Sequence, residues 1–419
     1  LASSAASDVY KRQIIDDVLL DDQSGQEMLK VTRLSAKFDI MPFFKGKISI
    51  SSVQLFGFNI NLRKETPDSP PNFKFVLDAF ASKDTVKKEN SLDLRINSIL
   101  IRRGRMSYHV LSEEETPGKF NAKHIQLQNI IANISLKALS KDSLNLGIKR
   151  LSLDEKASGF SLKKMSLKLV ANNKQTNIDN FTIELPETSL KLDTIHLEYD
   201  SLKAFDRFTE QVHFSFRTLP SQVTLKDISP FVPILSHFKE PVTLDMEVKG
   251  TVDQLTCSHL EITADDRQFR LRGDVSLQDL SRPQDAYVYG TLSELSANTR
   301  GVGFLVRNLS HNYNGVPPLL ERLGNVSFQG EISGYFTDLV TYGQLQTSLG
   351  NVKTDLKLSS DKTKGLFAYS GAVKTEDFQL GKLLDNEELG EITFNLDVHG
   401  RHIAVSYTHL RAHETSAHL

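Results

Sequence analysis

The sequence predicts an all-β protein: an elongated, curled, mostly antiparallel sheet that forms a β-groove, with a few short helices. Apolar and polar residues alternate with a period of two through most of the chain, as in strands with one buried face. Turn-forming clusters, such as DQSG at 22–25 and PDSPP at 67–71, separate these runs. Hydrophobic residues make up 39% of the 419 residues, which is low for a compact globular protein and favours a thin or open architecture.

The predicted strands succeed one another along the whole chain. In the earliest run, the alternation changes phase at Ser51-Ser52, which indicates a β-bulge. Short helices are expected at 71–82, 227–238 and 315–324, where apolar residues have helical spacing or prolines interrupt the pattern. The main alternating runs are Ile48–Leu62, Leu92–Ile96, Ile125–Leu127, Leu144–Leu153, Met165–Leu169, Phe181–Tyr199, Phe214–Phe216, Val242–Val248, Phe269–Leu271, Tyr287–Tyr289, Val326–Ile332 and Ile392–Val398.

A weak repeat marks the second half of the chain. The strand Val242–Gly250 alternates and ends in glycine, and similar strands recur at Val326–Gly334 and Ile392–Gly400. Each follows a helix-like or turn segment, which suggests an elongated β-structure extended by successive modules. We therefore expect an N-terminal β-groove region at 14–220 and a β-groove region with repeated helix–strand modules at 221–405.

Both ends of the chain differ from the interior. Residues 1–13 and 406–419 lack the alternation, and Ser7–Gln13 and Ser406–Leu419 resemble translated sequencing adapters. We expect both ends to be non-native and leave them out of the functional reasoning. A genuine frayed terminus is the alternative.

Motifs that carry chemistry are missing from the sequence. A formal net charge of −2 excludes nucleic-acid binding through a global positive field. The single cysteine, Cys257, excludes an internal disulfide framework. No phosphate-binding loop or nucleophile elbow occurs, and Gly301-Val-Gly303 is expected to be a turn. We therefore predict a non-enzymatic protein with no catalytic residue, no cofactor and no bound metal.

Isolated polar residues also have ordinary structural interpretations. His409 and His413 have a zinc-like spacing but lie in the excluded tail, and Asp265-Asp266 has turn composition. The cluster Arg102–Arg105 is expected at a solvated hairpin end rather than on lipid headgroups. The other histidines stand singly along predicted strands, where we expect solvated residues; they are His109, His124, His196, His213, His237, His259, His311, His399 and His402.

The apolar face of the strands is the remaining candidate for function. A sheet curled into a trough would offer acyl chains a continuous path, whereas stacked sandwiches would close this face. The pattern leaves both arrangements open, and also which face lines a groove. Our candidate lipid-binding residues occupy the most regular strands: Phe56, Phe58, Ile60, Val242, Leu244, Met246, Val248, Phe328, Ile332, Phe394 and Val398.

Residues 14–62 combine the turn Asp22–Gly25, the strand pattern Leu29–Asp39 and the linker and strand Lys45–Phe58. This combination resembles the N-terminal region of AsmA/TamB-type proteins of the Bacteroidetes. The segment 227–255 is similar to the recurring helix–strand module of that family. The resemblance extends over about 14–405 and depends on hydrophobic patterns, with no catalytic residues.

The resemblance implies a periplasmic protein, anchored in the inner membrane by an N-terminal helix, whose groove carries phospholipids between inner and outer membranes. Its partners would be acyl chains and, through regions missing here, an outer-membrane barrel-assembly protein. We therefore expect this chain to be an N-terminal fragment without its anchor. The alternative is a scaffold or chaperone-like module for outer-membrane protein translocation and assembly, which would bind client strands by β-augmentation.

Overall fold

The computed structural model is built mainly from strands, and its helices are short. The prediction of an all-β, mostly antiparallel fold with few short helices is therefore confirmed. The chain divides into two compact units: unit 1 is Leu1–Thr194 with Lys226–Ser236, and unit 2 is Ile195–Leu225 with His237–Leu419. The structure describes residues 10–39, 49–80, 95–140, 143–282, 285–309, 315–335, 337–361, 366–401 and 409–417.

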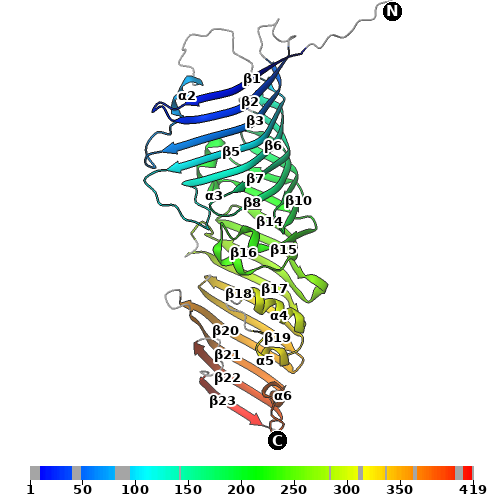
Figure 1. The fold of residues 1–419 in the computed structure, drawn as a ribbon. Coiled ribbons are helices and arrows are strands. Elements are labelled where there is room, and N and C mark those ends of the chain that lie inside the picture. The colour runs from blue at the N-terminus through cyan, green and yellow to red at the C-terminus, as the bar shows by residue number, and fades with distance from the viewer. Residues whose placement is uncertain are drawn as a thin grey trace, which may run out of the picture. The chain divides into compact units, whose positions relative to one another are not determined.

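Unit 1 is a ladder of long strands (Figure 1). Sequential strands pair antiparallel, except that β3 pairs with β4 and β5 in parallel. A parallel pair needs a crossover connection, and the connection from β3 to β5 contains a helix. The elements are β1 (Tyr10–Asp21), β2 (Glu27–Asp39), β3 (Ser49–Lys64), α2 (Lys74–Phe80), β4 (Arg95–Ile96), β5 (Ser98–Val110), β6 (His124–Ser140), β7 (Ser143–Glu155), β8 (Ser161–Asn172), β9 (Gln175–Glu184) and β10 (Ser189–Leu192).

Unit 2 contains an antiparallel ladder that runs from β14 to β23. Its strands are β11 (Ile195–Glu198), β12 (His213–Arg217), β13 (Ser221–Val223), β14 (Val242–Gly250), β15 (Gln254–Ala264), β16 (Phe269–Gln278), β17 (Tyr287–Ala297), β18 (Val326–Tyr335), β19 (Asp338–Thr347), β20 (Gly350–Asp361), β21 (Leu366–Gln379), β22 (Glu391–Arg401) and β23 (His409–Ala417). Its α-helices are α3 (Phe208–Gln211), α4 (Thr299–Leu309), α5 (Pro318–Arg322) and α6 (Leu380–Leu384).

Short 3₁₀ helices complete the structure: η1 (Leu202–Arg207), η2 (Leu225–Ile228), η3 (Pro233–His237) and η4 (Asp265–Arg267). The expected helix at 227–238 is therefore split into parts of η2 and η3, because Pro230 and Pro233 interrupt it. The expected helices at 71–82 and 315–324 correspond to α2 and α5. A short helix precedes each repeated strand: η3 before β14, α5 before β18 and α6 before β22.

The predicted turn at Gly301-Val-Gly303 is wrong, because these residues lie in α4. The Asn298 side chain accepts a hydrogen bond from the Gly301 backbone N–H at 2.9 Å and starts the helix. A Cβ atom at Gly301 would lie 1.7 Å from the Gln268 carbonyl oxygen. Glycine is required here for close packing of the helix and not for a turn.

Left-handed backbone positions interrupt the alternation of the long strands of unit 1. Asp17, Gly57, Arg103 and Asn129 have φ values of 54°, 64°, 55° and 55°, on β1, β3, β5 and β6. The bulge predicted at Ser51-Ser52 is confirmed by a register shift between β2 and β3 at this point. Arg103 lies within β5, so the expected hairpin end at Arg102–Arg105 is wrong.

Some expectations concern residues that the structure does not describe, namely Ile48, Leu92, Leu94, 81–82, His311, His402 and the extreme ends of the chain. Both segments set aside as non-native contribute strand residues where they are described. β1 begins at Tyr10, and β23 pairs with β22. The origin of these segments stays a prediction. No helix in the described ranges is long and apolar enough to cross a bilayer.

Candidate functional site

Apolar side chains from successive strands of unit 2 line up in a row across the ladder. Each residue of this row is the direct cross-strand partner of the next, from β14 to β22. The row contains the predicted candidates Leu244, Phe328 and Phe394, which are far apart in the sequence. Its members, in strand order, are Leu244, Ile262, Leu271, Leu295, Phe328, Leu345, Val352, Thr375 and Phe394.

A second row runs parallel to the first. It contains the candidates Val248, Ile332 and Val398, each four residues after a member of the first row. Because side chains alternate between faces, residues four apart on a regular strand share a face. The members of this row are Val248, Cys257, Val275, Gly290, Ile332, Thr341, Leu356, Gly371 and Val398. We call both rows together the apolar face of unit 2.

The opposite face of the same strands is mostly polar, although Val340 and Tyr342 also lie on it. Between β18 and β22 it carries residues that alternate with the two rows, including Glu331, Gln344, Lys353, Asp355, Lys374, Asn395 and Asp397. The sheet is therefore strongly amphipathic. The apolar side is the one that the alternation predicted, and which face lines a groove stays a prediction.

Among the described residues of unit 2, helices cover part of the apolar face. Helix α4 buries Val302 and Phe304 against Phe269, and Leu271 and Leu295 pack at the margin of this cluster. From β18 to β22 the short helices α5 and α6 lie beside the strands (Figure 1), and the apolar side chains of both rows remain partly exposed. The sheet therefore presents a largely apolar surface here, interrupted by Thr341, Gly371 and Thr375.

Unit 1 has an apolar face of the same kind. One cross-strand row runs from β2 to β9 and consists of Leu34, Leu55, Ile101, Ala132, Leu151, Met165 and Ile183. A neighbouring row consists of Ala36, Val53, Ile99, Ile134, Ile148 and Leu167. Most of these side chains are also only partly buried.

The three candidates on β3 differ in burial: Phe58 and Ile60 pack in a cluster, whereas Phe56 is exposed. Phe58 is buried with Val31, and Ile60 packs beside them. Phe56 does not share their face, because the left-handed Gly57 changes the alternation between Phe56 and Phe58. Phe56 is 40% exposed, and the Arg103 guanidinium lies 5.4 Å from its ring centroid.

The two other candidates on β14, Val242 and Met246, lie outside the two rows. Val242 packs against the α4 cluster, so its end of the apolar face is covered. Met246 lies at the register shift between β14 and β15. Its backbone N–H donates to Thr218 Oγ1 at 2.8 Å, and its carbonyl accepts from the Thr218 N–H at 3.0 Å.

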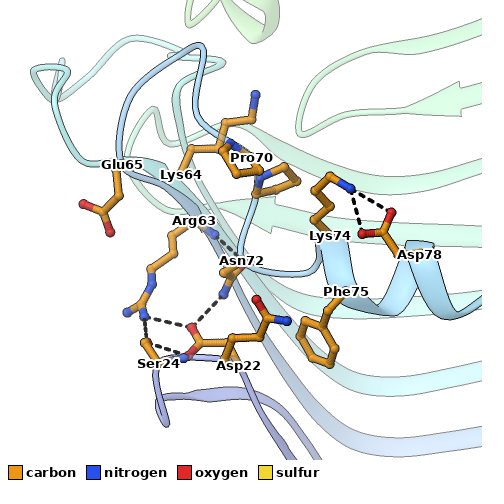
Figure 2. Close-up of a pocket in the computed structure, with 12 residues that line it drawn as sticks. Asp22, Ser24, Arg63, Lys64, Glu65, Pro70, Asn72, Lys74, Phe75 and Asp78 are labelled. Carbon is orange, nitrogen blue, oxygen red and sulfur yellow. Dashed lines mark hydrogen bonds and ion pairs between the residues drawn. The ribbon is translucent and has the colours of Figure 1, made fainter.

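The Asp22–Gly25 turn forms part of a polar pocket of about 260 Å³ in unit 1 (Figure 2). Asp22 is buried and lies between Arg63 and Asn72, which donate to its Oδ2 at 2.8 and 3.3 Å. The Ser24 hydroxyl and the Gln26 backbone N–H donate to Oδ1. The hydrogen bond from Ser24 is the main cause of a pKa for Asp22 well below its usual range.

The polar groups of this pocket therefore satisfy one another. Figure 2 shows the Asp22 carboxylate turned toward Arg63, Ser24 and Asn72. Lys74 is paired with Asp78 at 2.7 Å. This arrangement ties the β1–β2 turn to the end of β3 and to the segment before α2, so we interpret it as structural.

One group of described side chains could hold a metal ion: His109, Glu115 and His124. The expectation that His109 and His124 stand singly is wrong, because they are cross-strand partners on β5 and β6. The sequence contained a signal for this pair. Both histidines are equally distant from the centre of the turn cluster at 115–118.

No family model, curated protein or solved structure matches the chain. The resemblance of residues 14–62 and 227–255 to AsmA/TamB-type proteins therefore stays a prediction. What the chain does is inferred from its own apolar faces and polar clusters.

Proposed function

We propose that this chain is a non-enzymatic cell-envelope protein that shields phospholipid acyl chains during transfer between the inner and outer membranes. The observation that supports the proposal best is the apolar face of unit 2, which extends across the strands and is partly exposed. The periplasmic location and the membrane anchor come from the resemblance to AsmA/TamB-type proteins.

The dimensions of the apolar face suit an acyl chain. Neighbouring strands lie about 4.8 Å apart, so the path from β18 to β22 is about 19 Å long. One leaflet of a bilayer has a hydrocarbon thickness of about 15 Å. An acyl chain that lies across the strands, along a row, can therefore remain in apolar contact over most of its length.

The energetics favour a reversible, passive role. A fully buried methylene group contributes about 0.8 kcal/mol, and a chain on an open face buries about one side, or roughly half of that. Summed over the methylene groups of an acyl chain, this free energy favours the bound chain over the chain in water. Because adjacent row positions are chemically alike, it could move along the face without a large barrier. Direction would come from elsewhere.

Site-specific photo-crosslinking tests this proposal. Alternate residues of β20 point to opposite faces, so Val352 and Leu356 on the apolar face have matched controls in Lys353 and Asp355. We expect a photoreactive phenylalanine analogue at the apolar positions to crosslink phospholipid in cells, with little product at the control positions.

A substitution test is independent of crosslinking. Ile332→Asp should lower the amount of phospholipid that co-purifies with the chain in native mass spectrometry, whereas Glu331→Lys on the polar face should leave it unchanged. Absence of bound phospholipid in the unsubstituted chain, or equal crosslinking on both faces, would contradict lipid shielding.

Strand β1 favours the alternative function, a scaffold for outer-membrane protein assembly. It begins the ladder of unit 1, and Ile14, Ile15 and Leu19 are 51%, 52% and 57% exposed. An exposed apolar strand at the start of a ladder is suited to pairing with a client strand. Crosslinks from Leu19 to outer-membrane protein segments, with no lipid product from Val352, would support this function instead.

A further inference from the structure

We propose that His109, His124 and Glu115 form a binding site for a divalent transition-metal ion such as Zn²⁺. The site lies on unit 1, where the ends of β5 and β6 meet the loop between them. Its possible ligand atoms lie within 4.8 Å of one another. Imidazole nitrogens with a carboxylate oxygen are a usual ligand set for catalytic or regulatory zinc.

The distance between the imidazoles fits a shared metal ion. His109 Nδ1 and His124 Nδ1 are 3.1 Å apart. Two ligands that bind Zn²⁺ at 2.0–2.1 Å with tetrahedral angles are separated by about 3.3 Å. The ion would therefore fit between these nitrogens with only a small movement of the rings.

Backbone contacts orient His124 for this role. Its Nε2 lies 2.9 Å from the Glu113 carbonyl oxygen, which can only accept a hydrogen bond. The proton of a neutral His124 is therefore on Nε2, and the lone pair of Nδ1 points toward His109. A backbone carbonyl that accepts from the other ring nitrogen and so fixes the tautomer is typical of metal-binding histidines. Because His124 is only 6% exposed, its ring has little freedom to turn away.

Glu115 supplies the third ligand from the loop. Its Oε1 is 4.0 Å from His109 Nδ1, and the side chain is exposed, so the carboxylate can move closer to a bound ion. The loop is held beside the histidines because Asn121 Nδ2 donates to the Glu114 carbonyl at 3.1 Å. A bound ion would fasten this loop to both strands and leave a coordination position for water.

The surrounding charges allow a cation to bind. Arg63 is the neighbour of His109 on β3, but its guanidinium contacts Asp22 at 2.8 Å. Lys123 is paired with Glu113 at 2.6 Å. These two cations are therefore neutralised by carboxylates, and Glu114 and Glu115 add negative charge to the loop. Arg105 and Lys156 line a cavity on one side of His109.

The competing explanation is a simple hydrogen bond, in which a His109 N–H donates to His124 Nδ1. Titration calorimetry with Zn²⁺ on the full chain, after chelator treatment, separates the two. We expect a single Zn²⁺ per chain, and about 100-fold weaker binding in His124→Gln and in His109→Gln. Glu115→Gln should weaken binding by about tenfold.

Two control variants identify the site. His196→Gln removes a histidine that pairs with a carboxylate, Glu198 at 3.0 Å, and should leave Zn²⁺ affinity unchanged. The double variant His409→Gln/His413→Gln removes the zinc-like pair of the tail and should also bind Zn²⁺ normally. Co²⁺ absorption bands that disappear in His109→Gln, a partly exposed position, provide a second readout.

The absence of Zn²⁺ binding by the full chain would overturn the proposal. Binding that survives His124→Gln and is lost in His409→Gln/His413→Gln would do so as well, because the tail would then be the metal site. Circular dichroism of each variant checks that the strands are intact, so a loss of binding can be assigned to the missing ligand.

Discussion

Replacement of Phe304 by alanine tests how helix α4 is attached to the sheet of unit 2. Phe304 is 5% exposed, and its ring stacks on Phe269 with the centroids 5.5 Å apart. Together with Val302 it forms the buried surface that α4 presents to β16 and β17. Leu305 and Val306 add partly buried contacts, and Phe304 is the largest buried side chain of the helix.

The expected cost of Phe304→Ala follows from these contacts. Truncation of a buried phenylalanine usually lowers stability by about 3–5 kcal/mol. The aromatic pair accounts for about 0.5–1.5 kcal/mol of this sum. Because α4 lies at the surface and can settle into the space left behind, we expect a value near the lower limit, about 3 kcal/mol.

Urea denaturation followed by far-UV circular dichroism measures this loss. Arg300→Ala is the matched control, since Arg300 is on the exposed side of the same helix and should change stability by less than about 0.5 kcal/mol. If Phe304→Ala lowered stability as little as Arg300→Ala, Phe304 would not attach the helix to the sheet. The variant should also bind more phospholipid, because Leu271 and Leu295 lose their cover.

Three further predictions concern single residues. Hydrogen bonds lower the pKa of Asp22, so its carboxylate stabilises the fold above a pH of about 4, and this contribution is lost as the pH falls further. Asp22→Asn should therefore lower the thermal midpoint of unfolding at pH 7, with a smaller difference from the unsubstituted chain at pH 3. Gly301→Ala should lower stability by about 1–3 kcal/mol in urea denaturation, because its Cβ would meet the Gln268 carbonyl, whereas Gly303→Ala faces only a flexible arginine end and should be neutral or better. Burial, with the charge of Asp274, raises the pKa of the Cys257 thiol to about 11, so a disulfide reagent at pH 8 should modify it much more slowly in the folded chain than in urea.

The strands could be predicted because each has one buried face, which leaves a period of two in the sequence. The phase change at Ser51-Ser52 was visible for the same reason. The helix at Gly301-Val-Gly303 was not predictable in this way. Gly301 is needed because the helix lies close to Gln268 in the folded chain, and this contact is not visible in the sequence. In the sequence alone, two nearby glycines predict a turn.

The sequence predicted which single residues of the candidate site are apolar, but not how they line up into one surface. Alternation marked Leu244, Phe328 and Phe394 as apolar positions, yet their alignment in one row depends on every turn and bulge between β14 and β22. The His109–His124 pair depends on a single turn, so its register could have been inferred from the sequence around residues 115–118.

Coordinated phase changes keep the apolar face of unit 1 continuous. A left-handed residue shifts the alternation by one, so on a single strand it would move all later apolar side chains to the polar face. In unit 1 such residues occur on β1, β3, β5 and β6, at Asp17, Gly57, Arg103 and Asn129, whereas the described residues of β2, between β1 and β3, include none. On β2 and β3 the phase nevertheless changes together, since the partners Leu34 and Leu55 contact the same apolar cluster as the partners Val31 and Phe58, three residues away on each strand. A substitution that removed the shift on one of these strands alone would therefore break the rows.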